Sequence, residues 1–100
     1  MKIEITQTAD TVIAAIYGRL DTVTSSEFEQ TLSPYISIQG VELIMDCSQM
    51  EYISSSGLRV VLMAHKSISA NGGSFIIRNL SKEVRSVFDI TGFSRILKVE

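Results

Sequence analysis

The sequence predicts an α/β domain built on a single mixed β-sheet, in which an opening antiparallel hairpin precedes parallel strands joined by crossover helices. Two neighbouring runs near the N-terminus alternate apolar with other residues, which is the period of half-buried strands. Short apolar runs then alternate with segments of helical character. Repeats of strand, helix and strand favour parallel pairs with right-handed crossovers. The predicted element order is therefore β-β-α-β-α-β-α-β.

The opening hairpin is predicted from two alternating runs, residues 2–8 and 11–17. Ala9 and Asp10 lie between the runs and are typical of a tight turn. Gly18 follows the second run and is expected to end that strand.

The first helix is predicted over residues 25–32, after a segment rich in residues that cap helix N-termini, 20–24. Pro34 is expected to end, kink or restart this helix, because its ring clashes with the preceding turn. A further short helical piece is expected before Gly40.

The middle of the chain predicts a buried strand, a polar loop and a second helix. Residues 41–46 form a compact apolar run, typical of a strand in a parallel sheet. The serine-rich residues 47–56 are expected to form a loop, and residues 57–70 a helix that ends at the following Asn-Gly-Gly. Residues 74–78 then predict another short buried strand.

The last helix and strand are predicted from one capping residue and one apolar face. Ser81 can N-cap a helix that presents Val84, Val87 and Phe88 on one side. Gly92 closes this helix, and residues 96–99 predict the last short strand.

Composition limits the function classes that this chain can serve. Its 100 residues fit a single domain, residues 1–100, with 45% apolar and 20% charged residues. The net charge is −2 and the nine Lys and Arg residues are scattered, so we expect no nucleic-acid partner. No apolar run approaches the roughly 20 residues that cross a bilayer, and the N-terminus has no signal-peptide pattern. We therefore expect no membrane insertion.

The chain has one cysteine, Cys47, and one histidine, His65, so neither an internal disulfide nor a Cys or His metal site is expected. The pair Gly72-Gly73 is not followed by the Lys and Ser/Thr of a phosphate-binding loop, so no nucleotide cofactor is expected. A reducing cytoplasm is the simplest location for such a chain.

Three consecutive serines precede the second predicted helix: Ser54, Ser55 and Ser56. One hydroxyl can cap the helix by accepting a hydrogen bond from a free backbone N–H, which leaves the others near the surface. A helix N-terminus also tolerates added negative charge. A phosphate there would leave the fold intact and would oppose a partner docked on the same spot, because desolvating an unpaired dianion costs several kcal/mol. This is the physical basis of a binding switch.

Four segments of the chain form a recognisable pattern. In the first of them, Asp46 in the buried strand is followed by Tyr52-Ile53 and then by Ser55-Ser56-Gly57-Leu58. The other three are Gly18-Arg19-Leu20-Asp21, Gly72-Gly73 with Phe75-Ile76-Ile77, and residues 84–93. Together, and in this order, the four segments resemble the STAS domain of bacterial anti-sigma-factor antagonists. The sequence differs from the family at Ser54, where the family has Asp, and at Arg19, where acidic residues are common.

The resemblance implies a non-enzymatic binding module with a defined switch. Unphosphorylated, it would bind a kinase-type anti-sigma factor and release the sigma factor; the kinase would phosphorylate Ser55, and a metal-dependent serine phosphatase would reset it. Because Ser54 and Ser56 adjoin Ser55, they are alternative phosphorylation sites. The chain would act as a monomer or a weak dimer.

The predicted partner-binding surface combines the serine segment with the helix after it. On that helix, Val60, Met63 and Ala64 lie beside the predicted core face, so they either form an apolar strip for a partner or widen the buried face. We also expect Asp21 and Asp46 to lie near Ser55, at one end of the sheet. The predicted partner-binding residues are Asp21, Ser54, Ser55, Ser56, Gly57, Leu58, Arg59, Val60 and Met63.

Two alternatives remain open from the sequence. The chain could be a constitutive STAS subunit of a membrane-lipid or other ABC-type transport complex, which predicts stable association with an ATPase subunit. It could also be a small enzyme, but the Gly-x-Ser-x-Gly pattern is absent and His65 lies ten residues beyond Ser55, about two and a half helical turns away.

Overall fold

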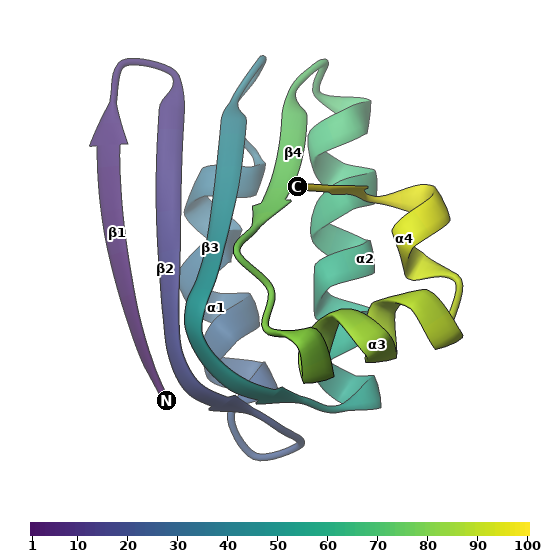
Figure 1. Cartoon of the computed structure of the whole chain (residues 1–100). Helices are drawn as coiled ribbons and strands as arrows, with labels where there is room; N and C mark the ends of the chain where they lie inside the picture. Colours follow the sequence, from purple (N-terminus) through teal and green to yellow (C-terminus); the bar gives the residue numbers. More distant parts are fainter.

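A five-stranded sheet, with its strands side by side in chain order, forms the centre of the molecule. The computed structural model describes residues 1–100 (Figure 1). The first strand pairs antiparallel with the second, and every later pair is parallel. This confirms the predicted mixed sheet. The strands are β1 (Lys2–Thr8), β2 (Thr11–Leu20), β3 (Glu42–Ile53), β4 (Ser74–Arg78) and β5 (Lys98–Val99).

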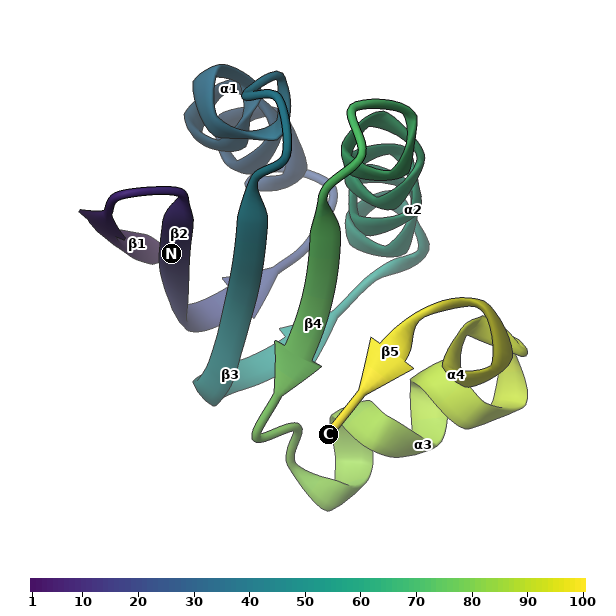
Figure 2. The same cartoon turned by 90° about the horizontal axis from the view of Figure 1, so that it is seen from above.

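Two long helices cover one face of this sheet. Figure 2 shows α1 and α2 side by side on that face, with α3 and α4 grouped at the end of the sheet formed by β4 and β5. No helix is long and apolar enough to cross a membrane. The helices are α1 (Ser25–Ile36), α2 (Ser55–Ala70), α3 (Lys82–Ile90) and α4 (Phe93–Ile96).

The core lies between the sheet and the helices. Along β2, the side chains of Val12, Ala14 and Ile16 are buried, which matches the alternation seen in the sequence. The corresponding residues of α1 are Phe28, Leu32 and Ile36, spaced one turn apart. A single cluster of 23 buried apolar residues joins all these elements, so the carboxyl ends of β2 and β3 are anchored in the same core as both helices.

The third strand is about twice as long as predicted. It runs over Glu42–Ile53, so most of the expected serine-rich loop is strand, and β2 likewise continues past Gly18 to Leu20. The two strands pair up to Leu20 and Ile53, with two register irregularities on the way. Those irregularities break the two-residue alternation, which is why this part of β3 does not look like a strand in the sequence.

The end of the first helix, the start of the second and the start of the last strand also differ from the predictions. The first helix continues through Pro34 to Ile36, because burial of Ile36 one turn after Leu32 favours continuation. The second begins at Ser55, two residues early, because Ser54 is its N-cap. Ile96 ends a short extra helix, α4, and the last strand starts only at Lys98.

Gly73, at the start of β4, is required by a close backbone approach. A Cβ atom there would lie 2.2 Å from the carbonyl oxygen of Val41. We expect Gly73→Ala to lower the free energy of unfolding by about 1–3 kcal/mol, the usual cost of overpacking. Urea denaturation measures this change, with Ser74→Ala, an exposed neighbour, as the control. Equal unfolding midpoints for Gly73→Ala and the wild type would contradict the contact.

Candidate protein-interaction site at the start of α2

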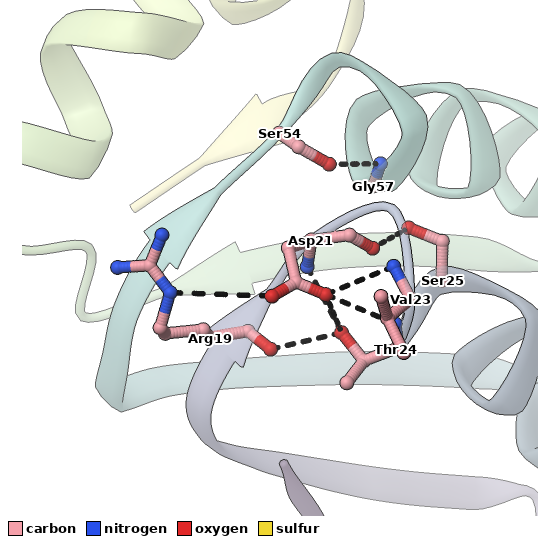
Figure 3. A network of polar contacts seen from close by, with 7 residues as sticks. All are labelled: Arg19, Asp21, Val23, Thr24, Ser25, Ser54 and Gly57. Carbon is pink, nitrogen blue, oxygen red and sulfur yellow. Dashed lines mark hydrogen bonds and ion pairs between the residues drawn. The ribbon is translucent and has the colours of Figure 1, made fainter.

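Ser54 joins the end of β2 to the start of α2. Its Oγ accepts a hydrogen bond from the Gly57 N–H at 3.2 Å, so this serine is the N-cap of α2 (Figure 3). Its own N–H donates to the carbonyl of Leu20, the last residue of β2, at 2.9 Å. Ser54 is thus held at both its backbone and its hydroxyl. A capping serine takes the place where the family has an aspartate, and both residue types accept from the same N–H groups.

Ser55 is the first residue of α2 and is exposed, whereas Ser56 is half-buried. Of the three serine hydroxyls, only that of Ser54 is hydrogen-bonded within the chain. The first turn of α2 contains no acidic residue. Negative charge placed at Ser55 would therefore meet the positive end of the helix dipole without a neighbouring carboxylate, an interaction worth roughly 0.3–1 kcal/mol.

The turn between β2 and α1 lies beside this serine segment and is built around Asp21 (Figure 3). The Asp21 Oδ1 atom accepts hydrogen bonds from the N–H groups of Val23 and Thr24, both at 3.0 Å. The Thr24 hydroxyl accepts from the Asp21 N–H and donates to the Arg19 carbonyl, each at 2.9 Å. Asp21 therefore holds the turn together.

The charge of Asp21 is stabilised by these contacts. Hydrogen bonding from Thr24 lowers the pKa of the Asp21 carboxyl below its ordinary value, with further lowering from the Val23 N–H and the positive charge of Arg19. The side chain is thus anionic at neutral pH, but one oxygen of its carboxylate is already occupied by backbone donors.

Arg19 and Tyr52 face each other across β2 and β3, just before the two strands end. The guanidinium carbon of Arg19 lies 4.1 Å from the centre of the Tyr52 ring, a stacked cation–π contact. The Arg19 Nε atom lies 4.0 Å from Asp21 Oδ2, an ion pair too long to be a hydrogen bond. The side chains of Arg19 and Tyr52 are exposed, and Val23, in the turn after β2, is 86% exposed.

The predicted partner-binding residues of α2 divide between surface and core. Arg59 is exposed and Met63 is half-buried, but Gly57, Leu58 and Val60 are buried. Of the two possibilities for this strip, the structure shows the wider buried face at Val60 and Ala64, so Val60 does not present an apolar side chain at the surface. The reason is that α2 packs against α1 as well as the sheet, which buries a second stripe of the helix.

Gly57 has its own packing role beneath the serine segment. A Cβ atom at this position would lie 2.8 Å from Leu20 Cγ and 3.0 Å from Ile53 Cγ1. The absence of a side chain therefore lets the first turn of α2 sit directly on the last residues of β2 and β3. The predicted contact between Gly57 and a partner cannot involve a side chain.

Asp46 does not join the site, contrary to expectation. It lies in the middle of β3, because that strand continues to Ile53. Its Oδ1 atom accepts hydrogen bonds from the Ser48 N–H at 3.0 Å and from Asn79 Nδ2 at 3.1 Å. The hydrogen bond from Asn79 is the main cause of its lowered pKa.

Other reactive groups offer no catalytic constellation. Burial raises the pKa of the Cys47 thiol to about 12, so it is protonated at neutral pH. No group of three His, Cys, Asp or Glu side chains lies close enough to hold a metal ion, and the surface has no enclosed cavity. Ser55 is therefore an exposed polar residue at the start of a helix with no cavity beside it, an arrangement suited to contact with another macromolecule.

The STAS domain family model matches residues 2–100. The chain belongs to the STAS domain family. The predicted resemblance to this family is thereby confirmed. The Gly-x-Leu-Asp segment forms the Asp21 turn, and the serine segment caps α2.

Relatives of this STAS domain carry regulatory names. BtrV of Bordetella bronchiseptica, named as a candidate anti-sigma factor antagonist, is 30% identical over 99 residues, which cover 99% of this chain and 85% of BtrV. The anti-sigma-B factor antagonist of Bacillus subtilis is 27% identical and covers 99% of this chain and 90% of that protein. The crystal structure of a candidate anti-sigma factor antagonist of Thermotoga maritima superposes with a TM-score of 0.87 at 25% identity, covering 97% of this STAS domain and 84% of that chain.

Three contributors to the site were not recognised from the sequence. Thr24 had a local signal, since it follows Asp21 at the three-residue spacing of a side-chain-capped turn. The stacking of Arg19 on Tyr52 had none, because it depends on the register between β2 and β3. The exposure of Val23 likewise follows only from the direction of the turn.

The pH dependence of stability tests the role of Asp21. Because its folded pKa is lowered, its contribution to stability is full above the unfolded value of about 3.9 and is lost as the pH falls through the folded value. We expect Asp21→Asn to be less stable than the wild type at pH 7 and the difference between the two to be smaller at pH 2. Urea midpoints at both pH values measure this.

The matched control for that experiment is Asp10→Asn, since the Asp10 carboxylate accepts no hydrogen bond within the chain. A stability difference for Asp21→Asn that is the same at pH 7 and pH 2 would show that the carboxylate charge does not hold the turn.

Proposed function

We propose that this STAS domain is an anti-sigma factor antagonist, a non-enzymatic binding module that docks on a serine-kinase anti-sigma factor and releases the sigma factor. The observation that carries the proposal is Ser55, an exposed serine at the positive end of a helix whose cap is already supplied by Ser54. The names of BtrV and of the Bacillus subtilis relative support the same role.

Phosphorylation is assigned to Ser55 because the other two serines are less available. The Ser54 hydroxyl caps the helix, so modifying it would disturb the bond to the Gly57 N–H. Ser56 is half-buried. Ser55 is exposed and its hydroxyl is not engaged within the chain, so a kinase can reach it without unfolding the first turn.

The switch follows because a phosphate on Ser55 has a different effect on the free energy of the free domain and on that of the docked complex. A phosphoserine carries a charge of about −1.5 to −2, which the N-terminus of α2 accommodates. Arg59 lies four residues later, on the same side of α2, and can pair with that phosphate. In a docked complex the dianion would instead be desolvated, at a cost of several kcal/mol. Binding is therefore lost while the domain stays folded.

The proposed docking surface combines Ser55 with side chains of the adjoining segments that reach the solvent. They come from the turn after β2, the end of β3 and the outer side of α2. The members are Arg19, Asp21, Val23, Tyr52, Arg59 and Met63. In this proposal a serine phosphatase resets the switch, the domain works in the cytoplasm as a monomer or a weak dimer, and no cofactor takes part.

Mass spectrometry of the chain purified from its native host tests the modification. We expect a single phosphate, located on Ser55 by peptide fragmentation. A phosphate on Ser54 or Ser56 would keep the switch and move its site. No phosphate under any growth condition, together with stable co-purification of an ATPase transporter subunit, would instead identify a constitutive subunit of a transport complex.

Substitution at Ser55 tests the consequence of the charge. Ser55→Asp should weaken binding to the anti-sigma factor at least tenfold, about 1.4 kcal/mol, while changing the melting temperature little. Ser55→Ala should bind like the unphosphorylated wild type. Calorimetric titration and thermal denaturation provide the two measurements.

Ser86→Asp is the matched control, since it adds the same charge on the exposed side of α3. If Ser55→Asp unfolds the domain, or binds as tightly as Ser86→Asp does, the separation of fold from interface is wrong.

A further inference from the structure

We propose that the stacked pair of Arg19 and Tyr52 determines partner specificity by receiving a carboxylate, from an Asp or Glu, on the surface of the anti-sigma factor. This inference rests on the proposed function and names the chemistry that its partner must present. It depends on where the pair lies, on its unused hydrogen-bond donors and on the local balance of charge.

The pair lies at the rim of the proposed docking surface. Arg19 and Tyr52 are cross-strand neighbours. Ser54 lies two residues after Tyr52, and its N–H donates a hydrogen bond to the Leu20 carbonyl. Of the five large apolar side chains that are exposed in this protein, Tyr52 and Val23 belong to the segments that flank the start of α2. A tyrosine stacked on an arginine is a pair of residue types that is enriched in interface hot spots.

The guanidinium of Arg19 is held in place but donates no hydrogen bond within the chain. Stacking 4.1 Å from the Tyr52 ring centre restricts the side chain. The Asp21 carboxylate is 4.0 Å away, too far to accept a hydrogen bond, and its Oδ1 atom is already occupied by backbone N–H groups. The fork of donors on Arg19 is therefore free to bind a planar carboxylate through two parallel hydrogen bonds.

The surrounding charges favour an acidic partner. Arg59, the other cation beside Ser55, forms no ion pair within the chain, and its side chain is exposed. Glu51 is directed toward Gly18, since its Oε2 atom is 3.8 Å from where a Cβ of that glycine would be. Arg19 and Arg59 thus lie on the two segments that meet at the start of α2, whereas the Asp21 carboxylate beside Arg19 is committed to its turn. The complementary surface is one that presents carboxylates.

The test uses the full chain and the purified anti-sigma factor that binds it. Arg19→Glu should weaken binding at least tenfold. Arg19→Lys should weaken it by a smaller factor, since a lysine cannot form the double hydrogen bond. The affinity of Tyr52→Leu should lie between those of the wild type and Arg19→Glu, because leucine keeps apolar area but removes the stacking. Arg95→Glu, the same charge change on α4, is the control and should bind within about twofold of the wild type.

A charge exchange identifies the receiving group. Changing the partner's contacting Asp or Glu to Lys should weaken the wild-type complex and restore binding to Arg19→Glu. Thermal denaturation of each variant establishes that it is folded, which is expected because both side chains are on the surface.

The outcomes separate this inference from the proposed function. If Ser55→Asp abolishes binding but Arg19→Glu binds like the wild type, the specificity role is wrong and the switch stands. If Arg19→Glu changes the partner binding or the thermal stability of the Ser55-phosphorylated form alone, the guanidinium pairs with the phosphate and the inference is again overturned. If the wild type binds no kinase-type anti-sigma factor, the proposed function fails and this inference fails with it.

Discussion

The arrangement of the site depends on the continued pairing of β2 with β3 up to Leu20 and Ile53. The hydrogen bond from the Ser54 N–H to the Leu20 carbonyl extends this ladder to the first residue of the cap. It brings together a turn that begins at Asp21 and a helix that begins at Ser55, although the two residues are 34 positions apart in the chain. Gly57 completes the join, because any side chain there would push α2 away from the strand ends.

On this frame the polar groups divide into two kinds. Asp21, Thr24 and Ser54 satisfy backbone groups at the two turns, and they are the residues that fix the geometry. The Ser55 hydroxyl and the Arg19 guanidinium have no such internal duty. A rigid scaffold that leaves a few polar groups unengaged at its surface is preorganised for recognition, because little ordering remains to be done when a partner binds.

The sequence was sufficient for the order of the elements other than α4 and for the position of Ser55 beside the start of the second helix, because short buried strands, helix caps and glycine turns are local signals. It was insufficient where tertiary pairing overrode local pattern. The irregular register of β3 concealed half of that strand, and burial of Ile36 carried α1 through Pro34. Val60 was misplaced for a related reason, since the contact of α2 with α1 is not visible in the periodicity of α2 alone.

The strand order of the sheet, which is the same as the order along the chain, has a consequence for how the protein is made. Each strand that leaves the ribosome finds its neighbour already synthesised, so the sheet can grow from one edge without waiting for a distant segment. The Asp21 turn and the helix that bears Ser55 both precede β4 and β5 in the chain. Every residue of the proposed docking surface is therefore synthesised before the last two strands.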